Sequence, residues 1–69
     1  MPIIRIEIGK HGKEQRRELI HKVTEVVVDV LKVPEANCMV LLKEIADENW
    51  GVGGKTIEEL KESFGEKID

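Results

Sequence analysis

The chain has 69 residues, a net charge of −3, two histidines ten positions apart and a single cysteine, Cys38. This composition excludes a disulfide and offers no metal-ligand cluster, and the interspersed charges argue against nucleic acid or anionic lipid as a partner. With no apolar run long enough to span a bilayer, the sequence predicts one small cytoplasmic domain over residues 1–69, marginally stable alone and assembled into oligomers.

The first predicted element is a strand over residues 3–8. Three isoleucines, Ile4, Ile6 and Ile8, alternate with Ile3, Arg5 and Glu7, which is the period of a strand with one buried face. Pro2 precedes this strand and falls on the face of the three alternating isoleucines.

Pro2 is the residue with the clearest chemical use. If Met1 is removed, as we expect, the secondary amine of Pro2 becomes the chain terminus, whereas with Met1 attached that nitrogen is an amide without an available lone pair. A free α-amino group has a pKa of roughly 7.7 to 8.0, and apolar neighbours or nearby cations lower it towards the value that suits a general base. In an arbitrary protein a proline after the first methionine is more often only a stiff residue, so the rest of the chain must decide.

Residues 9–12 contain two glycines and predict a loop, and residues 13–32 predict a helix that Val33 and Pro34 terminate. Gly12 is acceptable as its N-cap. The apolar positions of this helix are spaced by one and three residues and predict its packed face: Leu19, Ile20, Val23, Val26, Val27, Val30 and Leu31.

A connector over residues 35–37 precedes a second strand, which begins with five consecutive apolar residues at 38–42 and ends in a mixed segment at 43–45. A strand, a helix and a strand predict a right-handed crossover with parallel strands. One helix covers one face of such a sheet. The other face carries either Met39 and Leu41 or Val40 and Leu42, and it needs a second subunit to cover it.

The C-terminal third predicts a polar turn at 46–49 and then a tight hairpin or an arm at 50–54, where three glycines accompany Trp50 and Val52. A phosphate-binding loop is disfavoured because the Gly-Lys-Ser/Thr ending is missing. Residues 56–59, Thr-Ile-Glu-Glu, form a capping box that starts a short helix, whose packing face is Ile57, Leu60 and Phe64.

Taken together, these features resemble the 4-oxalocrotonate tautomerase family over residues 2–54. The resemblance is carried by Met-Pro before alternating isoleucines, Glu14-Gln15 and Leu19-Ile20 in the helix, Val33-Pro34, the apolar strand that runs into Lys43-Glu44-Ile45, and Asn-Trp-Gly-Val-Gly-Gly at 49–54. It implies an α+β fold: a β-α-β subunit with a parallel two-stranded sheet, a C-terminal hairpin and a short helix. It also implies dimers with joined sheets, commonly assembled as a hexamer that is a trimer of dimers.

The same resemblance implies a function. Such enzymes are isomerases that interconvert small enol acids, such as 2-hydroxydienoates, and their conjugated keto forms, without a metal or an organic cofactor. Pro2 would be the general base, in an apolar pocket between subunits.

Two departures from the family bear on the substrate. The family's arginine in the loop after the first strand has no counterpart here, where Lys10 and Lys13 supply charge without a bidentate fork. A second family arginine falls on Met39, which favours a monocarboxylate or a neutral carbonyl over a dicarboxylate. The predicted substrate-binding residues are Trp50, which stands at the family's pocket aromatic, Lys10, Lys13, Met39, Ile8 and Val52.

Several roles stay open from the sequence. The dienolate oxygen needs donors, for which the candidates are Lys10, His11, Lys13, backbone amides and a neighbour's Arg5, although each taken singly is more often a solvated charge. His21 is expected on the exposed surface, and Cys38 as a small buried residue rather than a nucleophile.

Two other functions compete with proton transfer. Pro2 could act as a nucleophile that forms an iminium, or could activate water for hydration or dehalogenation. A non-catalytic oligomeric binding module is the alternative from another class.

Overall fold

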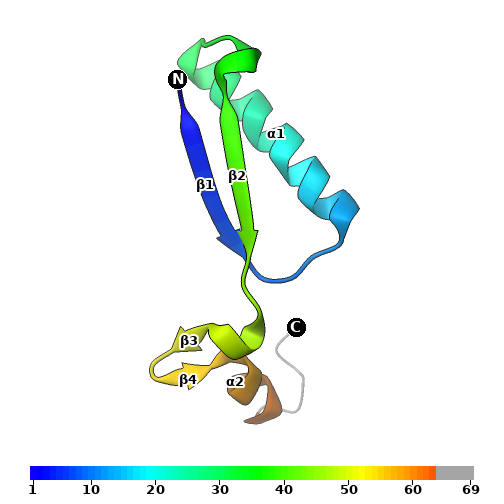
Figure 1. Cartoon of the computed structure of the whole chain (residues 1–69), viewed down its shortest axis with the longest axis vertical. Helices are drawn as coiled ribbons and strands as arrows, with labels where there is room; N and C mark the ends of the chain where they lie inside the picture. Colours follow the sequence, from blue (N-terminus) through cyan, green and yellow to red (C-terminus); the bar gives the residue numbers. More distant parts are fainter. Residues whose placement is uncertain (64–69) are drawn as a thin grey trace.

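The structure, a computed structural model, describes residues 1–63 and begins with a β-α-β unit. Its elements are β1 (Ile3–Ile8), α1 (Lys13–Leu31), the short 3-10 helix η1 (Glu35–Asn37) and β2 (Met39–Glu44). β1 and β2 are parallel, with Ile3 opposite Met39 and Ile8 opposite Glu44. The helix lies along one face of this two-stranded sheet (Figure 1). The predicted strand, helix and strand are confirmed.

The ends of α1 are fixed by local hydrogen bonds. At the start, Gly12 is the N-cap, and its backbone N–H donates to Gln15 Oε1 at 3.2 Å. At the end, Lys32 adopts a left-handed conformation with φ 56°, and its N–H donates to the Val28 carbonyl at 2.9 Å. The helix thus ends at Leu31, one residue before the predicted boundary, because the chain already turns at Lys32.

This left-handed cap provides a first prediction. Glycine adopts positive φ without the steric conflict of a Cβ, and at the end of α1 it would replace a strained lysine. The Lys32–Asp29 ion pair at 3.9 Å is highly exposed and stabilises little. We expect Lys32→Gly to raise the free energy of unfolding by about 0.5–1 kcal/mol, measured by thermal unfolding at fixed protein concentration. Lys22→Gly, in the helix interior, is the control and should be destabilising.

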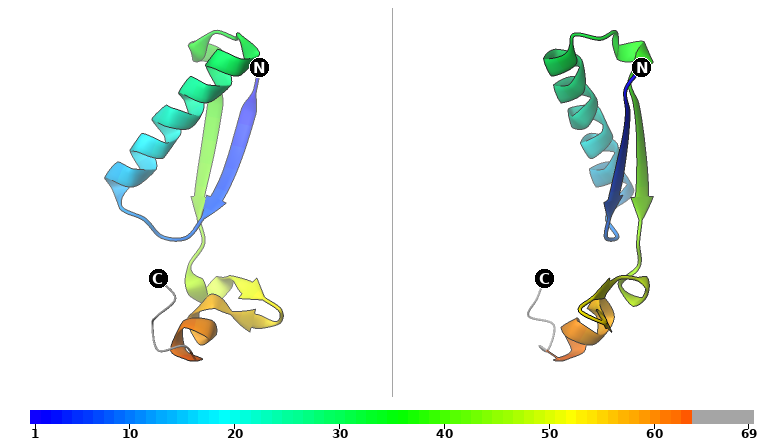
Figure 2. Two further views of the ribbon diagram at one scale, coloured as in Figure 1. Left: turned by 180° about the vertical axis from the view of Figure 1, so that it is seen from behind. Right: turned by 90° about the vertical axis from the view of Figure 1, so that its left-hand side faces the viewer.

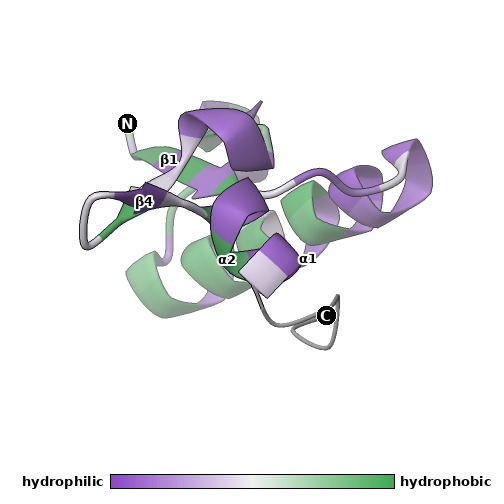
Figure 3. Ribbon diagram, turned by 90° about the horizontal axis from the view of Figure 1, so that it is seen from below, coloured by the Kyte–Doolittle hydropathy of each residue, from purple (hydrophilic) through white to green (hydrophobic). Residues whose placement is uncertain are grey.

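The predicted packed face of α1 is confirmed in part, since Leu19, Ile20, Val23 and Val27 are half-buried. Val26 and Val30, expected on the same face, are 61% and 66% exposed, and Leu31 is exposed as well. The half-buried residues also include Thr24 and Val28. The prediction was wrong at Val26, Val30 and Leu31 because the C-terminal half of α1 is largely apolar, as Figure 3 shows, so spacing alone could not set the edge of the packed face.

The sheet has one covered face and one bare face. The isoleucines at positions 4, 6 and 8 are half-buried under α1, together with Val40 and Leu42, as predicted for β1. On the opposite face Ile3, Met39 and Leu41 each leave about half of their surface exposed. Figure 2 shows this face without a covering layer. The sequence left open whether Met39 and Leu41 or Val40 and Leu42 lie on the uncovered face, and the structure places Met39 and Leu41 there. Within the described residues, both outer edges of the β1–β2 sheet are unpaired.

Residues 46–63 form a small second unit beyond the sheet. It contains η2 (Asp47–Asn49), the antiparallel strands β3 (Gly51–Val52) and β4 (Lys55–Thr56), and α2 (Ile57–Ser63). Gly53 and Gly54 have φ values of 62° and 88°, the positive angles that a two-residue hairpin turn requires. The predicted hairpin is confirmed.

The capping box that starts α2 is also confirmed. Thr56 Oγ1 accepts from the Glu59 N–H at 3.0 Å, while the Thr56 N–H donates to Glu59 Oε1 at 2.8 Å. Ile57 and Leu60, two members of the predicted packing face, are half-buried. The third, Phe64, lies outside the described residues.

The subunit is elongated. Its extents are 46 × 23 × 17 Å and its radius of gyration is 15.7 Å, compared with about 11 Å for a compact domain of this length. No side chain among residues 1–63 is fully buried. In the same part of the chain, no helix has the length and apolar character needed to cross a membrane.

Candidate active site

The predicted base lies at the end of the sheet where β1 begins. Pro2 is half-buried, like the isoleucines of its face. Its carbonyl oxygen accepts from the Met39 N–H at 3.0 Å, which extends the ladder by one bond and places Pro2 beside the start of β2. The structure therefore makes Pro2 and Met39 neighbours.

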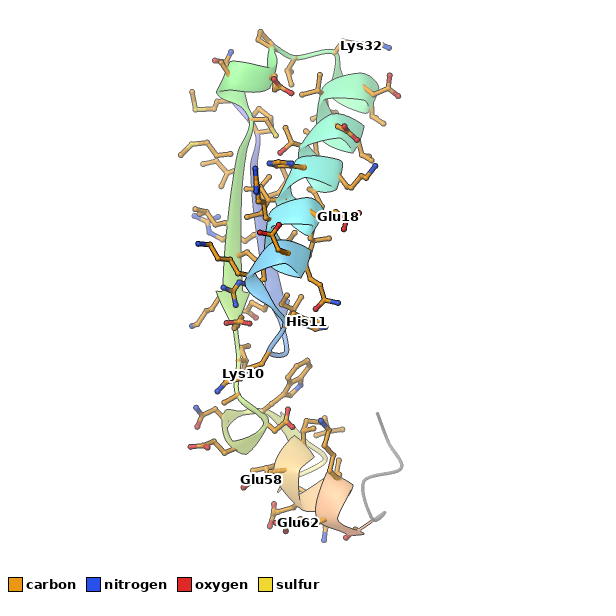
Figure 4. All side chains as sticks on the ribbon, turned by 90° about the vertical axis from the view of Figure 1, so that its right-hand side faces the viewer. Lys10, His11, Glu18, Lys32, Glu58 and Glu62 are labelled. Carbon is orange, nitrogen blue, oxygen red and sulfur yellow. The ribbon has the colours of Figure 1, made fainter. Side chains whose placement is uncertain are left out.

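A cavity of about 570 Å³ opens at the other end of the sheet, between the β1–α1 loop and the C-terminal unit. Figure 4 shows Lys10 and His11 on the loop side of this region and Glu58 on the α2 side. The cavity is lined by both apolar and charged residues: Gly9, Lys10, His11, Ala46, Asp47, Glu48, Trp50, Ile57, Glu58 and Lys61.

Trp50 is fixed in this cavity by its backbone and by its ring. Its carbonyl accepts from the Ile57 N–H at 2.8 Å, which ties it to the start of α2. The ring lies against Gly9, because a Cβ built at position 9 would meet Trp50 Cζ3 at 3.6 Å. In the same cavity, Lys61 Nζ pairs with Asp47 Oδ2 at 3.0 Å. The indole is thus held as an apolar wall beside a partly neutralised set of charges.

One subunit does not bring the predicted site residues together. Pro2 and Lys10 are separated by the length of β1, about 20 Å for six residues. Lys13 lies in the first turn of α1 and does not line the cavity, and neither does the exposed Val52 on β3. Ile8 ends β1, where its carbonyl accepts from the Ile45 N–H at 2.8 Å. The predicted set therefore forms two groups, one at each end of the sheet.

An ion pair that sequence reasoning missed ties the loop to the sheet and the helix. Glu44 Oε2 accepts from the His11 N–H at 2.8 Å and pairs with Arg16 Nη1 at 2.9 Å. The same Arg16 nitrogen donates to the His11 carbonyl at 2.9 Å. The His11 N–H and the Arg16 guanidinium lower the pKa of Glu44 below its usual 4.5. No local motif marks this contact, because Arg16 and Glu44 come from different elements.

The remaining predicted side chains have simple surroundings. His21 is exposed on α1, as expected, and Cys38 is half-buried just before β2. Among residues 1–63 there is no group of three or more His, Cys, Asp or Glu that could hold a metal ion.

Comparison with known proteins places these features in a family. Over residues 2–60 the sequence matches the protein family described as "Tautomerase enzyme". It is 38% identical over 64 residues to "Probable tautomerase K2" of Dickeya dadantii, spanning 90% of this chain and 96% of that protein. It is also 38% identical over 49 residues to "2-hydroxymuconate tautomerase" of Comamonas testosteroni, spanning 71% and 78% of the two chains.

A solved structure shows the same fold. The heterohexameric 4-oxalocrotonate tautomerase from Chloroflexus aurantiacus J-10-fl superimposes with a TM-score of 0.81 at 28% identity. The match covers 87% of this chain and 98% of that one.

Proposed function

Because the chain belongs to the tautomerase enzyme family and is an isomerase of the 4-oxalocrotonate tautomerase type, we propose that it interconverts enol acids and their conjugated keto forms with Pro2 as general base. The observation that carries this proposal is the separation of the site residues within one subunit. Pro2 and Met39 lie at one end of the sheet, and Lys10 and Trp50 lie at the other. A second copy must bring the two ends together.

Two-fold symmetry supplies that arrangement. An axis perpendicular to the strands sets the sheets of two copies antiparallel, so that the Pro2 end of each copy meets the Trp50 end of the other. The free edges and the bare face with Ile3, Met39 and Leu41 support such an assembly, as does the absence of fully buried side chains in residues 1–63. Since the Chloroflexus relative is a heterohexamer, we infer a homohexamer built as a trimer of dimers.

In this composite site the chemistry is a proton transfer. The unprotonated nitrogen of Pro2 removes the enol hydroxyl proton, and a negative charge develops on the dienolate oxygen. The ammonium group of Lys10 stabilises that charge, and Pro2 returns its proton to the conjugated carbon, so that a carbonyl replaces the enol. The apolar surroundings of Pro2 disfavour its charged form, which keeps the amine available as a base near neutral pH. This step requires the removal of Met1.

The residues at the two ends also suggest the substrate. Lys10 supplies a cation suited to one carboxylate at the Trp50 end, where the charge of Lys61 is offset by its pair with Asp47, and the indole provides an apolar wall. Beside Pro2 stands Met39, which offers no charge to a second carboxylate. We therefore infer a preference for an enol monocarboxylate with an apolar tail over a dicarboxylate.

The test of this function combines two measurements on untagged protein. Intact mass shows whether Met1 is absent, and ketonisation of phenylenolpyruvate and 2-hydroxymuconate measures turnover. We expect processed protein to convert both enols, with kcat/KM about tenfold higher for the monocarboxylate, the scale of one unpaired substrate charge. Processed protein that converts neither enol would contradict the proposal. A higher kcat/KM for 2-hydroxymuconate would overturn the preference alone.

A further inference from the structure

We propose that Glu44 and Arg16 form a clamp that positions the loop of residues 9–12, and with it Lys10, for substrate binding. This inference rests on the proposed function, because it assigns to the two residues a role in the site where Lys10 acts. Neither side chain lines the cavity, so both would be positioning residues rather than catalytic ones.

The first argument is the geometry around His11. Its backbone N–H is bound by the Glu44 carboxylate at 2.8 Å, and its carbonyl is bound by the Arg16 guanidinium at 2.9 Å. The same two side chains pair with each other at 2.9 Å. One ion pair therefore satisfies both backbone polar groups of a loop residue, and it joins the end of β2 to the first turns of α1 through that residue.

The second argument is that the rest of the loop is fixed around this point. His11 Nδ1 donates to the Gly9 carbonyl at 2.9 Å, since a carbonyl can only accept. On the other side, the Gly12 carbonyl accepts from the Arg16 N–H at 3.0 Å. Lys10 stands between Gly9 and His11, which are tied to each other. Its backbone position follows from theirs, and its side chain lines the cavity with Trp50.

The third argument comes from exposure and charge. The side chains of Arg16 and Glu44 are 32% and 29% exposed, whereas those of the neighbouring Arg17–Glu14 pair are 65% and 82% exposed. The pKa of Glu44 is lowered by the His11 N–H first, and then by the Arg16 side chain; the Lys10 charge acts in the same direction. A lowered pKa keeps the carboxylate ionised above it, so the clamp is lost only as the pH falls below 4.5. At neutral pH the Glu44 carboxylate is therefore ionised and able to pair with Arg16.

The neighbouring arginines allow a matched test. Arg16→Met removes the clamp, and Arg17→Met removes an arginine one position away whose pair with Glu14 is 3.8 Å long. We expect Arg16→Met to raise KM for phenylenolpyruvate about tenfold, the scale of one charge-assisted hydrogen bond, and to change kcat less than about threefold because Pro2 is untouched. The His11 amide should exchange with solvent about tenfold faster. Arg17→Met should leave KM, kcat and exchange within about twofold of wild type.

Two further variants separate positioning from general destabilisation. Glu44→Gln keeps an acceptor for the His11 N–H but loses the charge, so it should raise KM by less than Arg16→Met does. Arg16→Lys keeps the positive charge on a side chain without the planar guanidinium, so its KM should lie between the values for wild type and Arg16→Met. If the pair were only structural, its loss would lower the unfolding temperature, but KM would not be highest in Arg16→Met and intermediate in Glu44→Gln and Arg16→Lys.

The proposal and the function on which it rests fail differently. A wild-type protein that converts no enol overturns the proposed function and the role of Lys10 together. An active wild type whose KM and His11 exchange are unaffected by Arg16→Met overturns the clamp alone. Faster exchange with an unchanged KM would also overturn it, because the loop would then be ordered without serving the substrate.

Discussion

Pro2→Ala should lower kcat/KM for phenylenolpyruvate by about a hundredfold to ten-thousandfold, the range expected when a positioned general base is lost. Alanine still leaves an amine at the terminus after Met1 is removed, but this amine lacks the ring that fixes φ and holds the nitrogen in place. The half-buried ring beside Met39 is therefore the part of the site that the substitution removes. Steady-state kinetics on protein of verified mass measure the effect.

The chain's second proline provides the control. Pro34 is exposed and precedes η1, so Pro34→Ala changes a proline without touching the terminus. It should keep kcat/KM within about twofold of wild type. If processed Pro2→Ala retains kcat/KM within about threefold of wild type, the ring of Pro2 is not needed for catalysis, and its assignment as the positioned general base fails.

Leu41→Glu should dissociate the assembly and reduce activity by roughly a hundredfold or more, because it places a carboxylate on the bare face that a second copy covers in the proposed assembly. Arg5 lies directly opposite Leu41 in the β1–β2 ladder. It gives the new carboxylate a partner within the same chain, so the effect is directed at the assembly rather than at the subunit fold. Native mass spectrometry should show smaller species, and Leu41→Met, which keeps the face apolar, should remain assembled and active.

Mixed assemblies test whether each active site is shared between two chains, and they do so without changing the interface. A Pro2→Ala chain and a Trp50→Ala chain are each impaired, but a site that takes Pro2 from one chain and Trp50 from another is intact when the right chains meet. Random mixing at equal amounts should make about a quarter of the sites complete. Refolding the two variants together should therefore restore activity well above that of either alone. No gain on mixing would mean that each site is built within one chain.

Much of the fold was predictable because its signals are local. The alternation of β1, the glycines of the turn at 53–54 and the Thr56 capping box are each encoded within a few residues, and each was found in the structure. Only part of the packed face of α1 was predictable in this way. Val26 and Val30 are as apolar as their half-buried neighbours, and only the position of the sheet decides which valines it covers.

Candidate site residues could be named from the sequence, but their arrangement in space could not. Pro2, Lys10 and Trp50 were singled out by type and by resemblance, yet nothing in the sequence placed Pro2 and Trp50 at opposite ends of one subunit. The clamp was missed for a related reason. Glu44 and Arg16 meet only because the parallel crossover returns β2 beside the loop that follows β1, and no spacing rule encodes a contact of that kind.

The two unpaired edges of the β1–β2 sheet also bear on misassembly. Free backbone N–H and C=O groups can pair with any extended segment, so the edges that would join sheets in the proposed assembly also invite aggregation while partners are scarce. The bare face limits this risk unevenly. At the end where β1 begins, Ile3 and Met39 offer an apolar contact of low selectivity, whereas Glu7 and Lys43 lie opposite each other and are charged at the other end. Charged side chains beside a free edge oppose indiscriminate pairing, so aggregation is opposed most at the end of the sheet where its strands finish.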